Sequence, residues 1–208
     1  MRHGLTLLAL IACLPALAAC NRKDDPTNRD TGDLAYTSGH GADTALGNQA
    51  GALNMSLNVN PVGGVLAPQV FVSTVAGSDL FEIDSGKLAE ARAQSPALKA
   101  FATQLIADHV KSTMMLKSAA AQASPPVPVP TSLPPDLEAS LGALQGAKRQ
   151  DFDSGFVDTQ IQAHKKAVEV LTQYAAQGTS APLKQFAAAA LPVVKSHLAH
   201  LNGMKGQQ

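Results

Sequence analysis

The chain has 208 residues, of which 45% are hydrophobic, 4% aromatic and 15% charged. This length and composition suit one modest folded domain with appendages. The 16 Lys and Arg residues balance the 16 Asp and Glu residues, so no single-sign field attracts nucleic acid, and we exclude a nucleic-acid-binding protein. Two cysteines are too few for a disulfide framework or a cysteine-rich zinc site, which excludes those classes as well.

The first 20 residues have the pattern of an export signal with a lipid attachment site. Arg2 precedes an uncharged run, residues 4–19, which is long enough for a secretory signal and too short to span a bilayer. The run ends in Leu17-Ala18-Ala19-Cys20, which resembles the cleavage and acylation box of bacterial lipoproteins, and the next residue is Asn rather than Asp. We expect residues 1–19 to be removed and Cys20 to carry acyl chains that anchor the protein in the outer membrane, facing the periplasm.

A linker is expected between this anchor and the folded part. Residues 20–67 are rich in Gly, Asn, Asp, Thr and Ser, and their apolar residues are scattered singly without a helical or strand period. Such a segment cannot bury enough apolar surface to offset the entropy of ordering. We therefore expect a disordered linker over residues 20–67 and one folded domain over residues 68–205.

Four stretches of this domain have the period of an amphipathic helix, residues 70–93, 95–120, 151–177 and 179–201. Each carries one stripe of apolar residues at steps of three and four, and Ser95-Pro96 has the cap-then-proline order typical of a helix start. The alternation expected of strands is not sustained anywhere, so the sequence predicts an all-α fold.

The connection between the second and third stretches is unusually long. Residues 124–135 are rich in proline and must be extended, and residues 136–145 predict a short helix. Twelve extended residues reach roughly 37 Å, about the length of a 25-residue helix. Such a connection permits a crossover from one end of a bundle to the other, so we predict a ferritin-like antiparallel four-helix bundle.

Polar residues interrupt each apolar stripe at one place. Glu82 and His109 both lie about 20 Å from the turn at Ser95, and His164 and His197 both lie about 25 Å from the turn at Ser180, counted at 1.5 Å per residue. The four side chains should therefore converge at one level inside the bundle. His109 and His164 also occupy the same position of an internal repeat, because residues 106–122 align without gaps on residues 161–177. His200, one turn after His197, is a further candidate.

Three imidazoles and one carboxylate suit two different structures. They can hold one zinc, copper or iron ion, or they can form a neutral hydrogen-bonded network. A ferritin-type di-iron site needs Glu three residues before His, whereas Ile106, Ile161 and Val194 occupy those positions. We therefore expect a non-catalytic, lipid-anchored envelope protein with a structural or interaction role and a buried Glu/His network. The alternative is a periplasmic metal-binding module that uses Glu82, His109, His164 and His197.

Several short motifs between residues 70 and 204 occur in the order found in a known family. They include Phe81-Glu82, Asp108-His109, Phe152-Asp153, Leu191-Pro192 and His197-Leu198. Together they resemble the bacterial domain-of-unknown-function family 4142. The resemblance implies a ferritin-like four-helix fold in exported or outer-membrane-associated proteins, and it implies no activity. One departure is Ala163-His164, where family members often have Asp-His.

Overall fold

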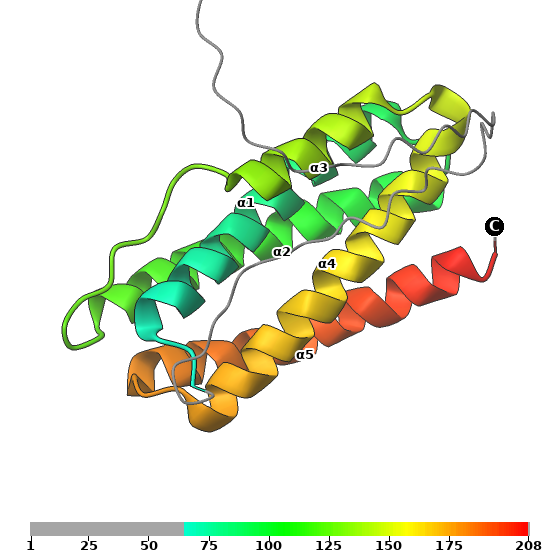
Figure 1. Cartoon of the computed structure of the whole chain (residues 1–208). Coiled ribbons are helices and arrows are strands. Elements are labelled where there is room, and N and C mark those ends of the chain that lie inside the picture. The colour runs from blue at the N-terminus through cyan, green and yellow to red at the C-terminus, as the bar shows by residue number, and fades with distance from the viewer. Residues whose placement is uncertain (1–64, 208) are drawn as a thin grey trace, which may run out of the picture. The chain divides into compact units, whose positions relative to one another are not determined.

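A computed structural model of the chain describes residues 65–207. The predicted signal peptide, Cys20 and the predicted linker as far as residue 64 lie outside the described residues. The described part is all-helical and contains no strand, which confirms the predicted fold class (Figure 1). Its helices are α1 (Pro68–Arg92), α2 (Pro96–Ala121), α3 (Pro135–Gly146), α4 (Arg149–Gln177) and α5 (Ala181–Lys205).

The four long helices, α1, α2, α4 and α5, form an antiparallel bundle in which α1 pairs with α2 and α4 pairs with α5 as hairpins. The two hairpin turns lie at opposite ends. At one end, Asp153 in the first turns of α4 accepts hydrogen bonds from the backbone N–H groups of Gln94 and Ser95, at 3.0 and 2.8 Å. At the other end, Phe71 at the start of α1 stacks on Tyr174 near the end of α4, with ring centroids 3.8 Å apart.

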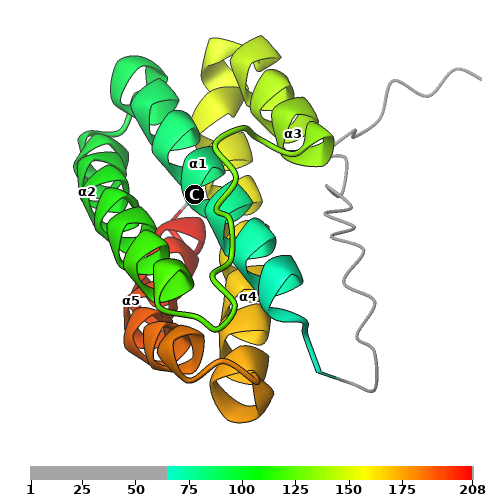
Figure 2. The same cartoon turned by 90° about the vertical axis from the view of Figure 1, so that its left-hand side faces the viewer.

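The connection from α2 to α4 crosses from one end of the bundle to the other along α1 (Figure 2). The side chain of Gln69, near the start of α1, donates to the carbonyl of Pro128 at 3.3 Å. The guanidinium of Arg92, at the other end of α1, donates to the carbonyl of Leu144 at 2.8 Å. The predicted ferritin-like crossover is therefore confirmed, and the short predicted helix is α3.

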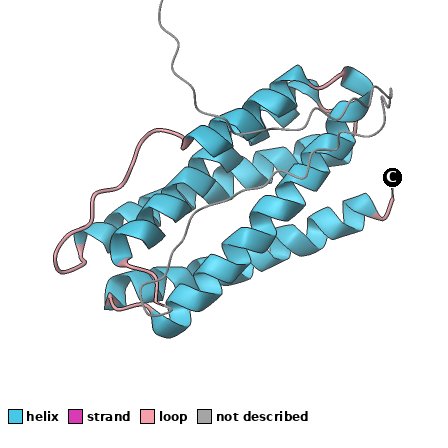
Figure 3. Ribbon diagram, in the orientation of Figure 1, coloured by secondary structure: helices cyan, strands magenta, loops and turns pink. Residues whose placement is uncertain are grey.

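Local sequence explains where helices begin and how closely they pack. The Ser95 hydroxyl accepts from the N–H of Leu98 at 3.3 Å, which caps α2. A Cβ on Gly86 would lie 2.7 Å from the Cγ1 atom of Ile106, so only glycine allows α1 and α2 to approach this closely. The turns after α1 and α4 are short, and the loop between α2 and α3 is the long one (Figure 3).

The apolar core consists of two clusters, one toward each end of the bundle. Large members of the first are Phe71, Val75, Leu116, Tyr174, Leu183 and Phe186. Large members of the second are Phe81, Phe101, Leu105, Phe152, Phe156 and Leu201. Between them, at mid-height, lie the buried polar residues of the stripes. The core therefore encloses a polar layer with apolar packing above and below it.

The packed region begins before the first helix. Leu66, which falls within the predicted linker, is only 2% exposed and packs in the first apolar cluster. Packing thus extends at least two residues before Pro68. Among the described helices, none combines the length and the apolar character needed to cross a membrane.

Candidate metal centre

Three buried histidines from three helices face one another at mid-height. His109 of α2, His164 of α4 and His197 of α5 are each at most 5% exposed. One ring nitrogen of each lies within 4.8 Å of the corresponding atoms of the other two. The ring centroids are 5.5–5.8 Å apart, so the rings form a nearly equilateral triangle. We call these residues the three-histidine cluster.

Each ring uses its outward nitrogen for a hydrogen bond to an oxygen. The three bonds join His109 Nδ1 to Asp79 Oδ1 at 2.8 Å, His164 Nδ1 to the Gln160 carbonyl at 2.9 Å, and His197 Nε2 to Asp108 Oδ2 at 2.9 Å. A backbone carbonyl and an ionised carboxylate can only accept, so the imidazole N–H is the donor in all three bonds. In a neutral imidazole, the other nitrogen then carries a lone pair.

When all three rings are neutral, the remaining nitrogens face one another and carry no proton to share. His164 Nε2 and His197 Nδ1 are 3.4 Å apart, and both have already used their ring's N–H elsewhere. His109 Nε2 is buried and has no hydrogen-bond partner among the described residues. Lone pairs that face one another repel, whereas a cation placed between them is attracted to all three. The arrangement is that of a histidine metal site, in which outer acceptors fix the tautomer of each ligand.

Two carboxyl groups lie against this cluster and add to its demand for a cation. Asp79 is 2% and Glu82 1% exposed, and neither pairs with Lys or Arg in the described part of the chain. Burial raises the pKa of Glu82 from 4.5 to about 7, helped by the nearby Asp79 and opposed by His109. Buried carboxylates are costly unless they are paired.

The histidines differ in how readily they take up a second proton. Burial lowers the pKa of His164 to about 3, with repulsion from His109 adding to the effect. Burial also lowers the pKa of His197, against the opposing hydrogen bond to Asp108. Burial alone would lower the pKa of His109 too, but the hydrogen bond to Asp79 and the charge of Glu82 outweigh it and raise that pKa. His164 and His197 are therefore neutral at pH 7.

The structure brings three of the five predicted site residues together and leaves the other two outside the group. His109, His164 and His197 come together, as the count along the helices predicts. Glu82 lies outside the group, because its Oε1 is 3.7 Å from Nδ1 of His164, the ring nitrogen on the outer side. His200 is exposed, and its ring makes a T-shaped contact with Phe101, with centroids 5.1 Å apart.

Sequence reasoning did not identify the three residues that orient the rings. Asp79 is one turn before Glu82 on α1, Asp108 directly precedes His109, and Gln160 is one turn before His164. The Asp108-His109 dipeptide was visible as a motif, but the bond runs from Asp108 to a histidine 89 residues away. A pairing of that separation has no signal in a single sequence.

Solved structures with a similar fold include two forms of one copper-bound protein. "CopM in the Cu(II)-bound form" is 19% identical with a TM-score of 0.58, and the match covers 69% of this chain and 98% of that chain. "CopM in the Cu(I)-bound form" is 21% identical with a TM-score of 0.57, covering 68% and 96%. A DUF305 fragment from Deinococcus radiodurans is 13% identical with a TM-score of 0.58, covering 68% and 96%. These likenesses support the helical-bundle fold.

No curated protein matches the chain. The model of one family, described as a domain of unknown function (DUF4142), matches residues 62–204, which span the whole bundle from before α1 to the last turn of α5. The chain therefore belongs to the DUF4142 family.

Proposed function

We propose that this domain is a non-catalytic module that binds a single copper ion at the three-histidine cluster. The observation that carries the proposal is the direction of the three inner ring nitrogens. His109, His164 and His197 each spend their N–H on an outer oxygen, and the nitrogens left over are buried and face one another.

The spacing fits a metal ion. In a tetrahedral site with metal–nitrogen bonds of about 2.0–2.1 Å, two ligand nitrogens are about 3.3–3.4 Å apart. His164 Nε2 and His197 Nδ1 are already at 3.4 Å, and a ring nitrogen of His109 lies within 4.8 Å of both. Asp79 and Asp108 would hold the outer N–H groups, which keeps the rings in the metal-binding tautomer.

Several metal ions bind neutral imidazole, and of these we propose copper. Sites of nitrogen ligands bind Cu²⁺ more tightly than the other divalent ions of the first transition row, including Zn²⁺. The fold shared with CopM in its Cu(I)-bound and Cu(II)-bound forms supports the same choice.

The second candidate function is a structural role for a metal-free polar network. The bonds of Asp79 to His109 and of Asp108 to His197 favour it, because they exist without an ion and satisfy buried groups. However, this network provides no proton between His164 and His197, and it leaves Nε2 of His109 without a partner. The copper site accounts for these atoms and the network does not.

The module would act in the bacterial envelope. The motif that ends in Cys20 supports cleavage after residue 19 and a lipid anchor in the outer membrane, with the bundle in the periplasm. Cys20→Ala should abolish labelling by a fatty-acid analogue and release the protein from the membrane fraction. Labelling that persists in this variant would contradict the anchor.

Metal titration tests the copper site. The purified metal-free protein should bind close to one equivalent of copper under reducing or oxidising conditions, and its melting temperature should rise. At a free copper concentration of about 100 times Kd, the gain in unfolding free energy is about 2.7 kcal/mol. Zinc should bind more weakly and stabilise less.

Single-histidine variants provide the controls. His109→Ala and His164→Ala should each remove the tight copper equivalent, whereas His200→Ala should keep it, because His200 is exposed and outside the cluster. If both cluster variants still bound copper, or if copper did not raise the melting temperature, the copper site would be wrong. The metal-free polar network would then be the better account of the buried histidines.

A further inference from the structure

The residues that hold the outer nitrogens of the three histidines differ in their exposure to solvent. The side chain of Asp108, which accepts from His197, is 32% exposed. The other two acceptor residues are buried, because Asp79 is 2% and Gln160 0% exposed. The hydrogen bond between Asp108 and His197 is therefore the one of the three that solvent reaches, and we call it the gate.

His197 can leave its outer acceptor with the least disturbance. The buried carboxylate of Asp79 also accepts from Thr113 at 3.3 Å, and the acceptor of His164 is a carbonyl one turn earlier in its own helix. Breaking either bond to a histidine would leave a buried polar group without that partner. Asp108 is partly hydrated, so water can replace the N–H of His197 there. His197 is therefore the histidine that can swing out and return.

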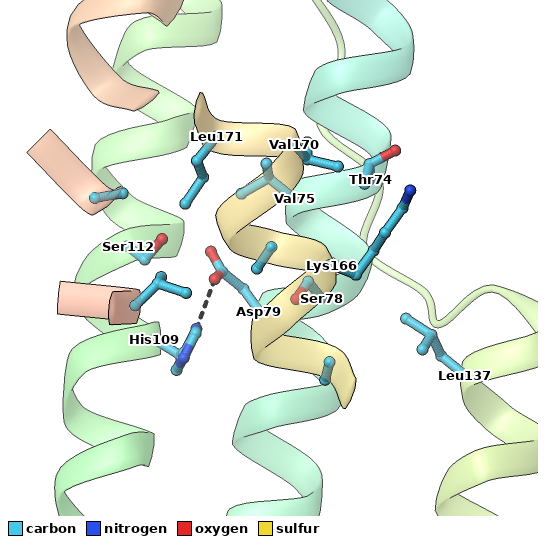
Figure 4. Close-up of a pocket in the computed structure, with 14 residues that line it drawn as sticks. Thr74, Val75, Ser78, Asp79, His109, Ser112, Leu137, Lys166, Val170 and Leu171 are labelled. Carbon is cyan, nitrogen blue, oxygen red and sulfur yellow. Dashed lines mark hydrogen bonds and ion pairs between the residues drawn. The ribbon is translucent and has the colours of Figure 1, made fainter. Parts of the chain in front are cut away.

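The short helix α3 closes the side of the bundle between α1 and α4. It packs on both of these helices (Figure 2). Its Leu137 is 1% exposed and lines a small cavity of about 30 Å³ that also borders Asp79 and His109 (Figure 4). A Cβ on Gly77 of α1 would lie 2.9 Å from Cγ of Pro134, so the start of α3 packs tightly on α1. This cover hinders the entry of an ion between α1 and α4.

The seam between α2 and α5 has no such covering helix in the described part of the chain. The gate crosses this seam, because Asp108 belongs to α2 and His197 to α5. His200 lies one turn after His197 and is exposed. Both imidazoles make T-shaped contacts with the ring of Phe101 on α2, with centroids 5.7 and 5.1 Å apart. An exposed imidazole, which is a ligand for copper, therefore stands beside the gate.

We propose that copper enters and leaves the three-histidine cluster through the seam between α2 and α5, with His197 as the ligand that moves and His200 as the ligand that receives the ion at the surface. This inference rests on the proposed function, because it concerns the route to the same copper ion. It assigns a role to His200, which lies outside the cluster.

The transfer is an exchange of ligands and needs no co-reactant. The bond of His197 to Asp108 opens, and the ring turns toward the seam. A copper–nitrogen bond to His197 then forms as the bond to His200 breaks, and the ring carries the ion inward to His109 and His164. The oxidation state of the ion and the protonation of the rings are the same before and after. Three nitrogens hold the ion more tightly than one, so the ion moves inward.

His200→Ala tests the surface ligand. Cu(I) is offered to the full metal-free protein, without oxygen, as a complex with a chromophoric chelator whose absorbance follows loading, and an excess of the free chelator measures release. The variant should slow loading and release by the same factor, about tenfold or more, because it leaves the final site intact. Ser196→Ala is the control, because this exposed residue adjoins His197 but has no ligand nitrogen, and it should change neither rate.

Asp108→Ala and Asp79→Ala test the gate. Each variant loses an outer acceptor, so both should bind copper more weakly. Asp108→Ala should in addition load about tenfold faster, because a charge-assisted hydrogen bond no longer holds the ring of His197 inward. Asp79→Ala should not load faster, because Asp79 is buried on α1 and does not lie at the seam.

The outcomes distinguish this route from the proposed function itself. If copper does not bind, both are wrong. If copper binds and His200→Ala exchanges it as fast as Ser196→Ala does, the role of His200 is wrong. If Asp108→Ala does not load faster, the seam is wrong, and faster loading of Asp79→Ala in its place would put the entry between α1 and α4.

Discussion

Glu82 illustrates how the burial of one carboxyl group makes the stability of this protein depend on pH. Its pKa is raised from 4.5 to about 7 because the folded chain removes it from water. Between these two values the folded protein binds more protons at Glu82 than the unfolded chain does. The contribution of Glu82 to the free energy of unfolding therefore decreases as the pH rises from 4.5 through 7.

The first prediction concerns Glu82→Gln in the metal-free protein. Glutamine keeps the shape of the side chain and never ionises, so the variant should equal the parent in stability near pH 4.5 and exceed it at pH 8. The shift in the pKa of Glu82 corresponds to about 3 kcal/mol of unfolding free energy. Urea unfolding at both pH values measures the difference. The control is Glu169→Gln, at an exposed position, which should change stability by the same small amount at pH 4.5 and at pH 8. If Glu82→Gln also changed stability equally at the two pH values, the prediction would be wrong.

The outer carboxylates should tune the affinity of the histidines without touching the ion. Asp79→Ala and Asp108→Ala each remove the acceptor that holds one imidazole N–H. Loss of such an outer partner typically weakens metal binding by about 10–100-fold, so we expect this loss with one equivalent retained. A competition titration with a chelator measures it. Asp158→Ala, which removes a surface ion pair with Lys205, is the control, and an equal effect there would contradict the role.

At the scale of the elements, the hairpin turn between α1 and α2 is fixed by a residue of α4. Asp153 accepts from the N–H groups of Gln94 and Ser95, which would otherwise remain without partners at the turn. The same residue thus ties the first helix pair to the second at the end where α4 begins.

The third prediction follows from this contact. Asp153→Ala should lower the unfolding free energy by about 1–3 kcal/mol, because it leaves charge-assisted hydrogen bonds unmade. The urea midpoint should fall with an unchanged slope. Asp151→Ala, in the first turn of α4 but exposed, should cost only the weak helix-dipole interaction of under about 1 kcal/mol. If the two variants were equally stable, Asp153 would have no special role in joining the pairs.

For the whole molecule, the polar layer divides the core into two apolar clusters, and an ion in that layer would join α2, α4 and α5 directly. Asp79 links α1 to the same centre through His109. Copper would therefore stabilise the bundle as a unit rather than one of its hairpins.

The fourth prediction is a proton count for loading. The pKa of His109 is raised, whereas those of His164 and His197 are lowered, so His109 is the ligand that carries a second proton as the pH falls. Below its pKa, copper binding should release about one proton from His109, and the apparent affinity should fall about tenfold per pH unit. Above that pKa, the number of protons that copper binding releases from His109 should approach zero. Calorimetry in buffers of different ionisation enthalpy measures it, and a count that does not change with pH would contradict the assignment.

The sequence alone determined the helices and the height of the histidines within the bundle. Both depend on local quantities: the period of the apolar stripes, the cap at Ser95, and a rise of 1.5 Å per residue counted from each turn. The length of the proline-rich connection showed that a crossover was possible, because an extended chain has a fixed reach, and the family resemblance implied the ferritin-like fold.

Only the tertiary structure decided which atoms of those side chains meet. Whether a ring presents Nδ1 or Nε2 depends on the oxygen that accepts from its other nitrogen, and for His109 and His197 this oxygen is 30 and 89 residues away along the chain. The same holds for Glu82, which the sequence placed at the right height but which packing turns toward the outer side of His164. Height along a helix is a local property, whereas the direction of a buried polar side chain is decided by all the helices packed around it.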